Sequence, residues 1–279
     1  MKIVSSGKGL YSSEFYEKKQ KSKRIKLIVY CSSFIVFLIV LVLFFRWDKF
    51  LINEIVVSDE IVINREEVAE SVREELFGYY FYLIPKNNAF LYRRGALKAS
   101  LIQEFPRFRS LNLNLEGFKK LIISADEREG YALYCTEYSS EVENVDCFFV
   151  DKEGLIFRKA PSFSYGVYFA YTLTPSLTEH LGQVLMETNE FKSLSQFIEG
   201  LPVLGIHASA IEIGNSGYEL MLNKGGKILW KRDADLSRIY TNLESFLSDE
   251  SIKSQKDFLD RIDHLDLRTE DKVFWKLKE

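Results

Sequence analysis

The early part of the chain contains one long unbroken apolar stretch, residues 27–45, which carries no charged side chain. A helix rises about 1.5 Å per residue, so this stretch would span about 28 Å, close to the hydrocarbon thickness of a bilayer. A buried helix of a soluble protein is rarely apolar on every side over such a length. The pattern predicts a transmembrane helix at 27–45, followed by Arg46 and Trp47 as interfacial side chains.

After this stretch the periodicity changes from strand to helix and back to strand. Asn64 suits a helix N-cap, and Val68, Val72 and Leu76 recur at the spacing of one helix face. Pro106 ends a second periodic segment, and alternating leucines follow it. The predicted order is a strand at 55–57, a helix at 65–77, a helix at 94–105, and strands at 110–115 and 121–125.

From about residue 130 onward, short strand patterns predominate and two helical patterns interrupt them. Residues 161–185 contain Pro161, Pro175 and several Ser and Thr, which predicts a surface connection. The chain as a whole therefore belongs to the α+β class. The strands are predicted at 131–135, 147–150, 155–157, 210–213, 218–222, 227–230, 265–268 and 272–278, and the helices at 191–201 and 236–247.

The charge of the chain is unevenly distributed. Residues 1–26 contain eight basic and two acidic side chains, whereas the whole chain has a formal net charge of -3. Because basic residues flanking a membrane segment stay inside the cell, the tail is expected in the cytoplasm and residues 48–279 outside it. A cleaved signal peptide is the alternative, but it needs a small-residue cleavage site, which the Phe-Phe-Arg-Trp sequence at 44–47 lacks. The tail's charge adjoins the membrane segment, so no nucleic-acid partner is expected.

Two of the three cysteines, Cys135 and Cys147, lie in the part expected outside the cell, where disulfides persist. They flank a polar loop at the facing ends of two predicted strands. A hairpin would bring their Cα atoms to about 5 Å, within disulfide range. We predict a Cys135–Cys147 disulfide; the alternative is two unpaired buried thiols. Cys31 lies inside the predicted membrane helix.

Sequence motifs of enzymes are missing. The chain has no glycine-rich phosphate loop of the required length, no G-x-S-x-G, no H-E-x-x-H and no C-x-x-C, and its three histidines are far apart. Asp263, His264 and Asp266 lie along a predicted strand and are interpreted as surface residues. We therefore expect no catalytic residue, metal site, cofactor or small-molecule substrate.

Several short motifs occur in a fixed order after the membrane segment. They are Asn-Glu-Ile-Val-Val at 53–57, Tyr-Phe-Tyr-Leu-Ile-Pro at 80–85, Ala-Asp-Glu-Arg at 125–128, Phe-Val-Asp-Lys-Glu-Gly-Leu-Ile-Phe at 149–157, and the hairpin containing 264–268 and 273–275. Together they resemble the FtsQ/DivIB family of bacterial cell-division proteins. The chain departs from the family pattern at Ser58-Asp59, Gly130, Tyr134 and Thr269.

The resemblance implies a membrane-anchored α+β architecture. Its parts would be a basic cytoplasmic tail at 1–26, a signal anchor at 27–45, a POTRA domain of order β-α-α-β-β at 48–129, and an FtsQ-type β domain with packed helices at 130–279. It also implies a non-catalytic divisome scaffold in the cytoplasmic membrane at the septum. Such a scaffold binds FtsB- and FtsL-like partners and helps to regulate septal wall synthesis.

The last predicted strand is the candidate partner site. Val273, Trp275 and Leu277 alternate along it with lysines and Phe274, so the two sets lie on opposite faces. A strand at the edge of a sheet can accept a partner's strand, with backbone bonds supplying affinity. Trp275 is expected to point into the core. The candidate partner-binding residues are Arg268, Thr269, Lys272, Phe274 and Lys276.

Three other interpretations stay open. The lysines could simply protect an edge strand from unwanted pairing. The protein could be an anchored sensor that binds a small ligand in a pocket. It could also be a POTRA-type transport or assembly component, although such proteins end in a β-barrel, and we expect the chain after residue 130 to be too short for one.

Overall fold

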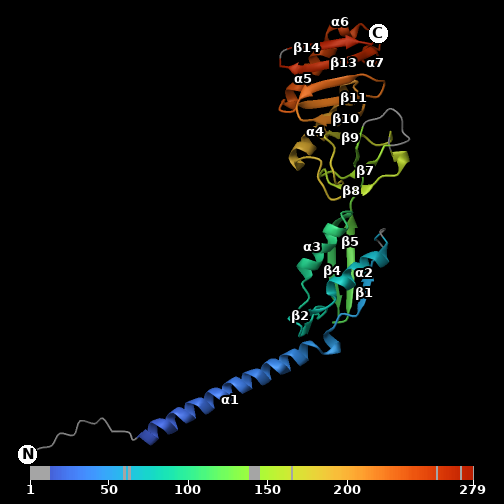
Figure 1. Cartoon of the computed structure of the whole chain (residues 1–279). Helices are drawn as coiled ribbons and strands as arrows, with labels where there is room; N and C mark the ends of the chain where they lie inside the picture. Colours follow the sequence, from blue (N-terminus) through green and yellow to red (C-terminus); the bar gives the residue numbers. More distant parts are fainter. Residues whose placement is uncertain are drawn as a thin grey trace, which may run out of the picture. The chain divides into compact units, whose positions relative to one another are not determined.

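The computed structural model describes residues 13–58, 61, 64–137, 145–164, 166–255, 257–270 and 272–278 (Figure 1). The fold is mixed α/β with one long N-terminal helix. The chain forms two compact units: the first comprises residues up to 98 and 112–124, and the second comprises 99–111 and 125–279. The predicted domain boundary at residue 130 stays a prediction.

The N-terminal helix α1 (Ser13–Phe45) contains the predicted apolar stretch. From Lys19 to Phe45 it is long and apolar enough to cross a membrane, and none of this span is buried in the protein. The C-terminal end of the helix is bonded to a later residue of the first unit. The buried Asn88 side chain donates a hydrogen bond from Nδ2 to the Phe45 carbonyl at 2.8 Å. That bond satisfies one of the carbonyls that a helix leaves unpaired at its C-terminus.

The elements after α1 include the predicted strand, two helices and two strands in that order, but a short hairpin, which the sequence did not predict, lies between the two helices. Asn64 caps the first of these helices by accepting a hydrogen bond from the Glu66 N–H at 3.2 Å, and Val68, Val72 and Leu76 are buried as their spacing predicts. A small sheet has the order β1-β5-β4, with β1 parallel to β5. The elements are η1 (Asp48–Phe50), β1 (Glu54–Val57), α2 (Arg65–Leu76), β2 (Tyr79–Tyr80), β3 (Ile84–Pro85), α3 (Arg94–Glu104), β4 (Phe108–Glu116) and β5 (Lys120–Glu127).

The second unit is built on one nine-stranded sheet of order β14-β13-β12-β11-β10-β9-β6-β7-β8 (Figure 1). The strands are β6 (Ala132–Cys135), β7 (Cys147–Val150), β8 (Ile156–Lys159), β9 (Ala170–Thr174), β10 (Ala208–Gly214), β11 (Gly217–Leu222), β12 (Lys227–Lys231), β13 (Ile262–Thr269) and β14 (Lys272–Leu277). The helices are η3 (Ser162–Ser164), α4 (Thr188–Gly200), η4 (Leu201–Leu204), α5 (Leu236–Ser248), α6 (Glu250–Lys253) and α7 (Phe258–Arg261).

The helices of this unit pack on one face of the sheet. Phe191 of α4 and Leu243 of α5 belong to the same buried cluster as Tyr171 and Trp230 of the strands. A smaller cluster on other strand positions contains Leu133, Phe149 and Phe157. Alternation along each strand thus divides its side chains between two layers.

The prediction that residues 161–185 form a surface connection is wrong in its middle. There the chain forms β9, which lies between β6 and β10 and runs parallel to both. Ala170, Tyr171 and Thr172 of this strand are buried. The Pro, Ser and Thr on either side of β9 resemble a loop, and both neighbours of β9 come from distant parts of the chain, so local pattern alone did not reveal it.

The structure confirms the Cys135–Cys147 disulfide. Cys135 ends β6 and Cys147 begins β7, and the two residues face each other in the β6–β7 register with their Cα atoms 4.1 Å apart. Closing so short a loop stabilises a fold by about 2–3 kcal/mol in the chain-entropy description. Both cysteines also contribute to the smaller apolar cluster of the sheet.

Candidate functional site

Strand β14 ends the large sheet, and among the described residues it pairs only with β13. The Lys278 N–H donates to the carbonyl of Arg261, the residue just before β13, at 2.8 Å, so the Lys278 N–H points toward the β13 side of β14. Backbone groups alternate sides along an antiparallel strand. The N–H groups of Val273, Trp275 and Leu277 therefore point out of the sheet, where an added strand would bind.

The opposite end of the sheet is closed by the chain itself. Beside β8, the Ile156 N–H donates to the Gln183 carbonyl at 2.9 Å, and the Gly182 N–H donates to the Ile156 carbonyl at 2.8 Å. Leu155 also forms an isolated bridge with Val184. Unpaired edges invite association, and the fold covers this one with a loop. The β14 edge has no such cover from the described residues.

Large apolar side chains flank the open edge on both faces of the sheet. Phe274 is 53% exposed and lies opposite Asp266 in the β13–β14 register. Trp275 lies on the helix-covered face, where its ring centroid is 5.4 Å from that of Phe258. It is nevertheless 41% exposed. The side chain therefore points toward the core face, as expected, but it is not buried there. The reason is positional, because among the described residues β14 is the outermost strand of the sheet and no neighbouring strand covers this side chain.

The structure brings all five predicted residues to the β13–β14 hairpin. Arg268 and Thr269 end β13, and Lys272, Phe274 and Lys276 lie on β14, with Thr269 opposite Lys272. No acidic residue occurs between 272 and 278, so the edge strand is basic. A basic edge with an apolar side chain suits an extended segment that carries carboxylates.

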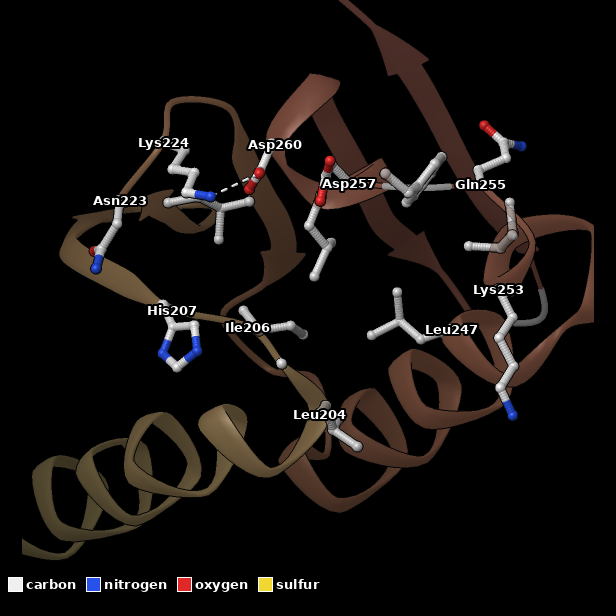
Figure 2. Close-up of a pocket in the computed structure, with 15 residues that line it drawn as sticks. Leu204, Ile206, His207, Asn223, Lys224, Leu247, Lys253, Gln255, Asp257 and Asp260 are labelled. Carbon is white, nitrogen blue, oxygen red and sulfur yellow. Dashed lines mark hydrogen bonds and ion pairs between the residues drawn. The ribbon is translucent and has the colours of Figure 1, made fainter.

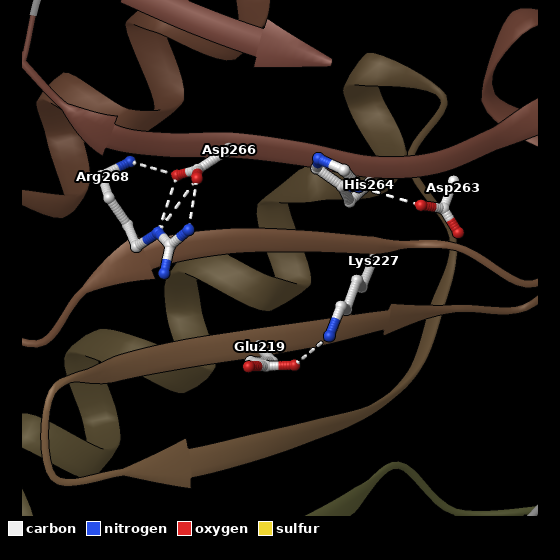
Figure 3. A network of polar contacts seen from close by, with 6 residues as sticks. All are labelled: Glu219, Lys227, Asp263, His264, Asp266 and Arg268. Carbon is white, nitrogen blue, oxygen red and sulfur yellow. Dashed lines mark hydrogen bonds and ion pairs between the residues drawn. The ribbon is translucent and has the colours of Figure 1, made fainter. Parts of the chain in front are cut away.

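Sequence reasoning missed the partner of Arg268. Its Nε lies 2.9 and 3.0 Å from the two carboxylate oxygens of Asp266, and its Nη2 lies 2.5 Å from Oδ2 (Figure 3). These bonds hold the pKa of Asp266 below its usual value and raise the pKa of Arg268. The pair therefore stays ionised at neutral pH and is lost only as the pH falls through the lowered Asp266 pKa. The sequence did contain a signal for this pair. Asp266 and Arg268 are two residues apart on a strand, and this spacing puts both side chains on one face.

Further polar contacts lie along the same face of the sheet. Lys227 forms an ion pair with Glu219 at 2.6 Å, and the His264 Nδ1 lies 2.9 Å from the Asp263 Oδ2. Figure 3 draws both contacts. Asp263, His264 and Asp266 are thus surface strand residues that bond to neighbouring side chains, as the sequence interpretation held. Such pairs between exposed groups contribute at most about 1 kcal/mol each.

A groove of about 600 Å³ follows the helix side of the open edge. The turn between β13 and β14 is tied to α5: Arg238 pairs with Glu270 at 3.1 Å, and the Asn242 amide donates to the Glu270 carbonyl at 3.2 Å. An added strand would place alternate side chains in this groove. Its lining includes Asn242, Phe246, Asp249, Ile252, Val273 and Trp275.

A separate pocket of about 510 Å³ lies near the turn between β11 and β12 (Figure 2). Lys224 and Asp260 are paired with each other at 2.7 Å, and Figure 2 shows Asn223, Lys253 and Gln255 directed away from the hollow. Small-molecule sites usually have a few polar groups that converge on the ligand. Most of the polar groups here are paired with each other or point away from the hollow, so the open edge is the stronger candidate site.

Neither a scan against protein-family models nor a search of the curated proteins finds a match for this chain.

Proposed function

We propose that this protein is a non-catalytic, membrane-anchored scaffold that binds an extended segment of a second anchored protein along β14. The observation that carries the proposal is the open edge, with three outward N–H groups and the exposed Phe274 and Trp275. Backbone hydrogen bonds would supply affinity, and the side chains would set the register and the selectivity.

The resemblance to the FtsQ/DivIB family suggests which process the scaffold serves. The partner would be an FtsB-like protein paired with an FtsL-like one, and the complex would help to regulate septal wall synthesis at the division site. The β1-α2-α3-β4-β5 order supports a POTRA-type first domain. Two proteins anchored in one membrane meet at a raised effective concentration, so a modest interface suffices.

A merely protected edge is the main rival. Lysines on an edge strand discourage pairing, and β14 carries them. A protected edge, however, does not require Phe274 and Trp275 to be half exposed on its two faces, nor a groove beside it. Exposed apolar surface bordered by polar groups is typical of a protein-binding site.

The proposal requires the large sheet to lie outside the cytoplasm. The basic flank before α1 supports this orientation. The bond from Asn88 to the Phe45 carbonyl supports a helix that stays attached to the mature protein.

Protease added to intact spheroplasts is expected to digest the second unit and leave the tail intact. Protection of the second unit together with cleavage of the tail would show the reverse orientation.

Partner binding is expected to depend on Phe274. In a capture assay with the full chain in detergent micelles and the FtsB-like protein of the same cells, Phe274→Ala should raise the dissociation constant about 30-fold, since a hot-spot side chain contributes about 2 kcal/mol. Arg268→Gln should also weaken binding, because it removes a basic group that would attract a partner's carboxylate. Glutamine is chosen because, unlike glutamate, it places no second negative charge beside Asp266.

Val203→Ala is the matched control for this assay. Val203 is 83% exposed and lies in η4, away from the β13–β14 hairpin in sequence, so its loss should leave binding unchanged. Lys276→Pro is not a clean test, because the alternation from Lys278 points the Lys276 N–H toward β13. If Phe274→Ala and Arg268→Gln both bind like wild type while their thermal melts are unchanged, the edge is only a protected edge.

A further inference from the structure

The turn between β2 and β3 presents two aromatic side chains to the surroundings. Phe81 and Tyr82 are 91% and 94% exposed. Leu83 beside them and Phe77 before the hairpin are exposed as well. Single exposed apolar residues are common, but a cluster of them marks an interaction surface. The described residues of the first unit leave this cluster uncovered.

The backbone of this turn is unusual for aromatic residues. The Leu83 N–H donates to the Tyr80 carbonyl at 3.0 Å, which leaves Phe81 and Tyr82 as the two central residues. Their φ angles are 50° and 62°, in the left-handed region that hairpins of this type normally fill with Asn or Gly. Large side chains rarely adopt this region. Because both side chains are almost fully exposed, ring packing within the described unit does not offset this strain.

The hairpin is attached to the end of the membrane helix. The Arg46 guanidinium lies 5.6 Å from the centroid of the Tyr79 ring, and β3 contacts α1. The residues just after β3 are bonded to the same place, since Asn88 donates to the Phe45 carbonyl. Figure 1 shows β2 beside the end of α1. The hairpin is therefore held near the point where the apolar stretch ends.

Other aromatic rings gather at the same point. The Phe50 centroid lies 4.9 Å from that of Phe44, 5.3 Å from Phe90 and 5.4 Å from Phe118. Trp47 and Phe90 are each about half exposed. Aromatic side chains concentrate where a membrane protein meets the headgroup layer. The membrane-proximal end of the first unit thus has the side chains of a membrane interface.

We propose that Phe81, Tyr82 and Leu83 insert into the interfacial layer of the same bilayer that α1 crosses. The hairpin is then a second membrane contact, which fixes how the first unit stands on the membrane surface. The inference requires α1 to span a membrane but does not require the partner proposed for β14.

Spin labelling of the full chain tests this contact. In a Cys31→Ser background, Tyr82→Cys and Val203→Cys each provide one labelled site, because Cys135 and Cys147 are joined in the disulfide. The chains are reconstituted in vesicles of phosphatidylcholine and phosphatidylglycerol. The label at 82 should show a ratio of oxygen to nickel-chelate collisions several-fold higher than the label at 203, because oxygen concentrates in lipid and the chelate stays in water.

A second variant assigns the effect to the hairpin. Adding Phe81→Glu to the chain labelled at 82 should lower its collision ratio toward that of the label at 203, since a carboxylate resists entering the bilayer. Equal ratios at 82 and 203 would overturn the proposal, as would a ratio that Phe81→Glu leaves unchanged. A label at 82 shielded from both reagents would also overturn it and would indicate a second copy of the chain on the hairpin.

Discussion

Replacing Asp151 by alanine is expected to destabilise the second unit by about 3–5 kcal/mol, the usual cost of breaking a buried ion pair by removing one partner. Asp151 is buried and forms an ion pair with Arg128, whose side chain is also largely buried. Its Oδ1 accepts hydrogen bonds from the Glu153 and Leu155 N–H groups, both at 2.9 Å. One carboxylate thus shapes the turn before β8 and neutralises an arginine.

The loss would leave Arg128 with a buried, unpaired charge. Its Nε donates to the Pro106 carbonyl at 3.1 Å, which holds the guanidinium in place after the carboxylate is gone. The free energy of unfolding can be measured by urea titration of the full chain in detergent micelles, followed by tryptophan fluorescence. Asp146→Ala is the matched control, because Asp146 pairs with Lys159 at 2.7 Å with both side chains exposed, and should cost less than about 1 kcal/mol.

Two further variants separate the roles of Asp151. Asp151→Asn keeps an acceptor for the turn N–H groups but removes the charge, so its cost reports the ion pair. Arg128→Ala combined with Asp151→Ala should cost less than the sum of the single changes, because the two residues interact directly. An Asp151→Ala protein as stable as Asp146→Ala would contradict the assigned role.

Gly226→Ala is expected to lower the free energy of unfolding by about 3 kcal/mol, which combines the strain of a left-handed alanine with overpacking. The φ of Gly226 is +91°, and a Cβ there would lie 2.2 Å from the Ile262 carbonyl oxygen. This contact is with backbone, which cannot rotate away as a side chain can. Relief would require β13 to move from the β11–β12 turn, so partner binding at β14 should weaken as well.

Gly225→Ala is an internal control for this effect. Gly225 has nearly the same φ, +83°, but a Cβ there would meet only the flexible end of Lys278, at 3.1 Å. It should therefore cost about 1–2 kcal/mol, the strain alone. The same urea titration compares the two variants. Equal losses would show that the close approach to Ile262 does not restrict the packing of β13.

The elements that the sequence predicted correctly depend on neighbours in the chain. Residues 27–45 needed only their own composition to indicate a helix long and apolar enough to cross a membrane. Asn64 caps α2 because its side chain reaches an N–H two residues away. Cys135 and Cys147 pair because a local hairpin brings them together. The last strand and its two faces likewise followed from simple alternation.

The features of the fold and of the candidate site that the sequence did not reveal depend on contacts between distant segments. The sequence could not place β9 between β6 and β10, because both of its neighbours are far away along the chain. It could not show that the β8 edge is covered while the β14 edge is open, since that depends on where the 182–185 loop packs. Local pattern determined most of the strands but not β9, and only long-range packing decided which strand edge is exposed, because closing long loops requires many contacts to form together.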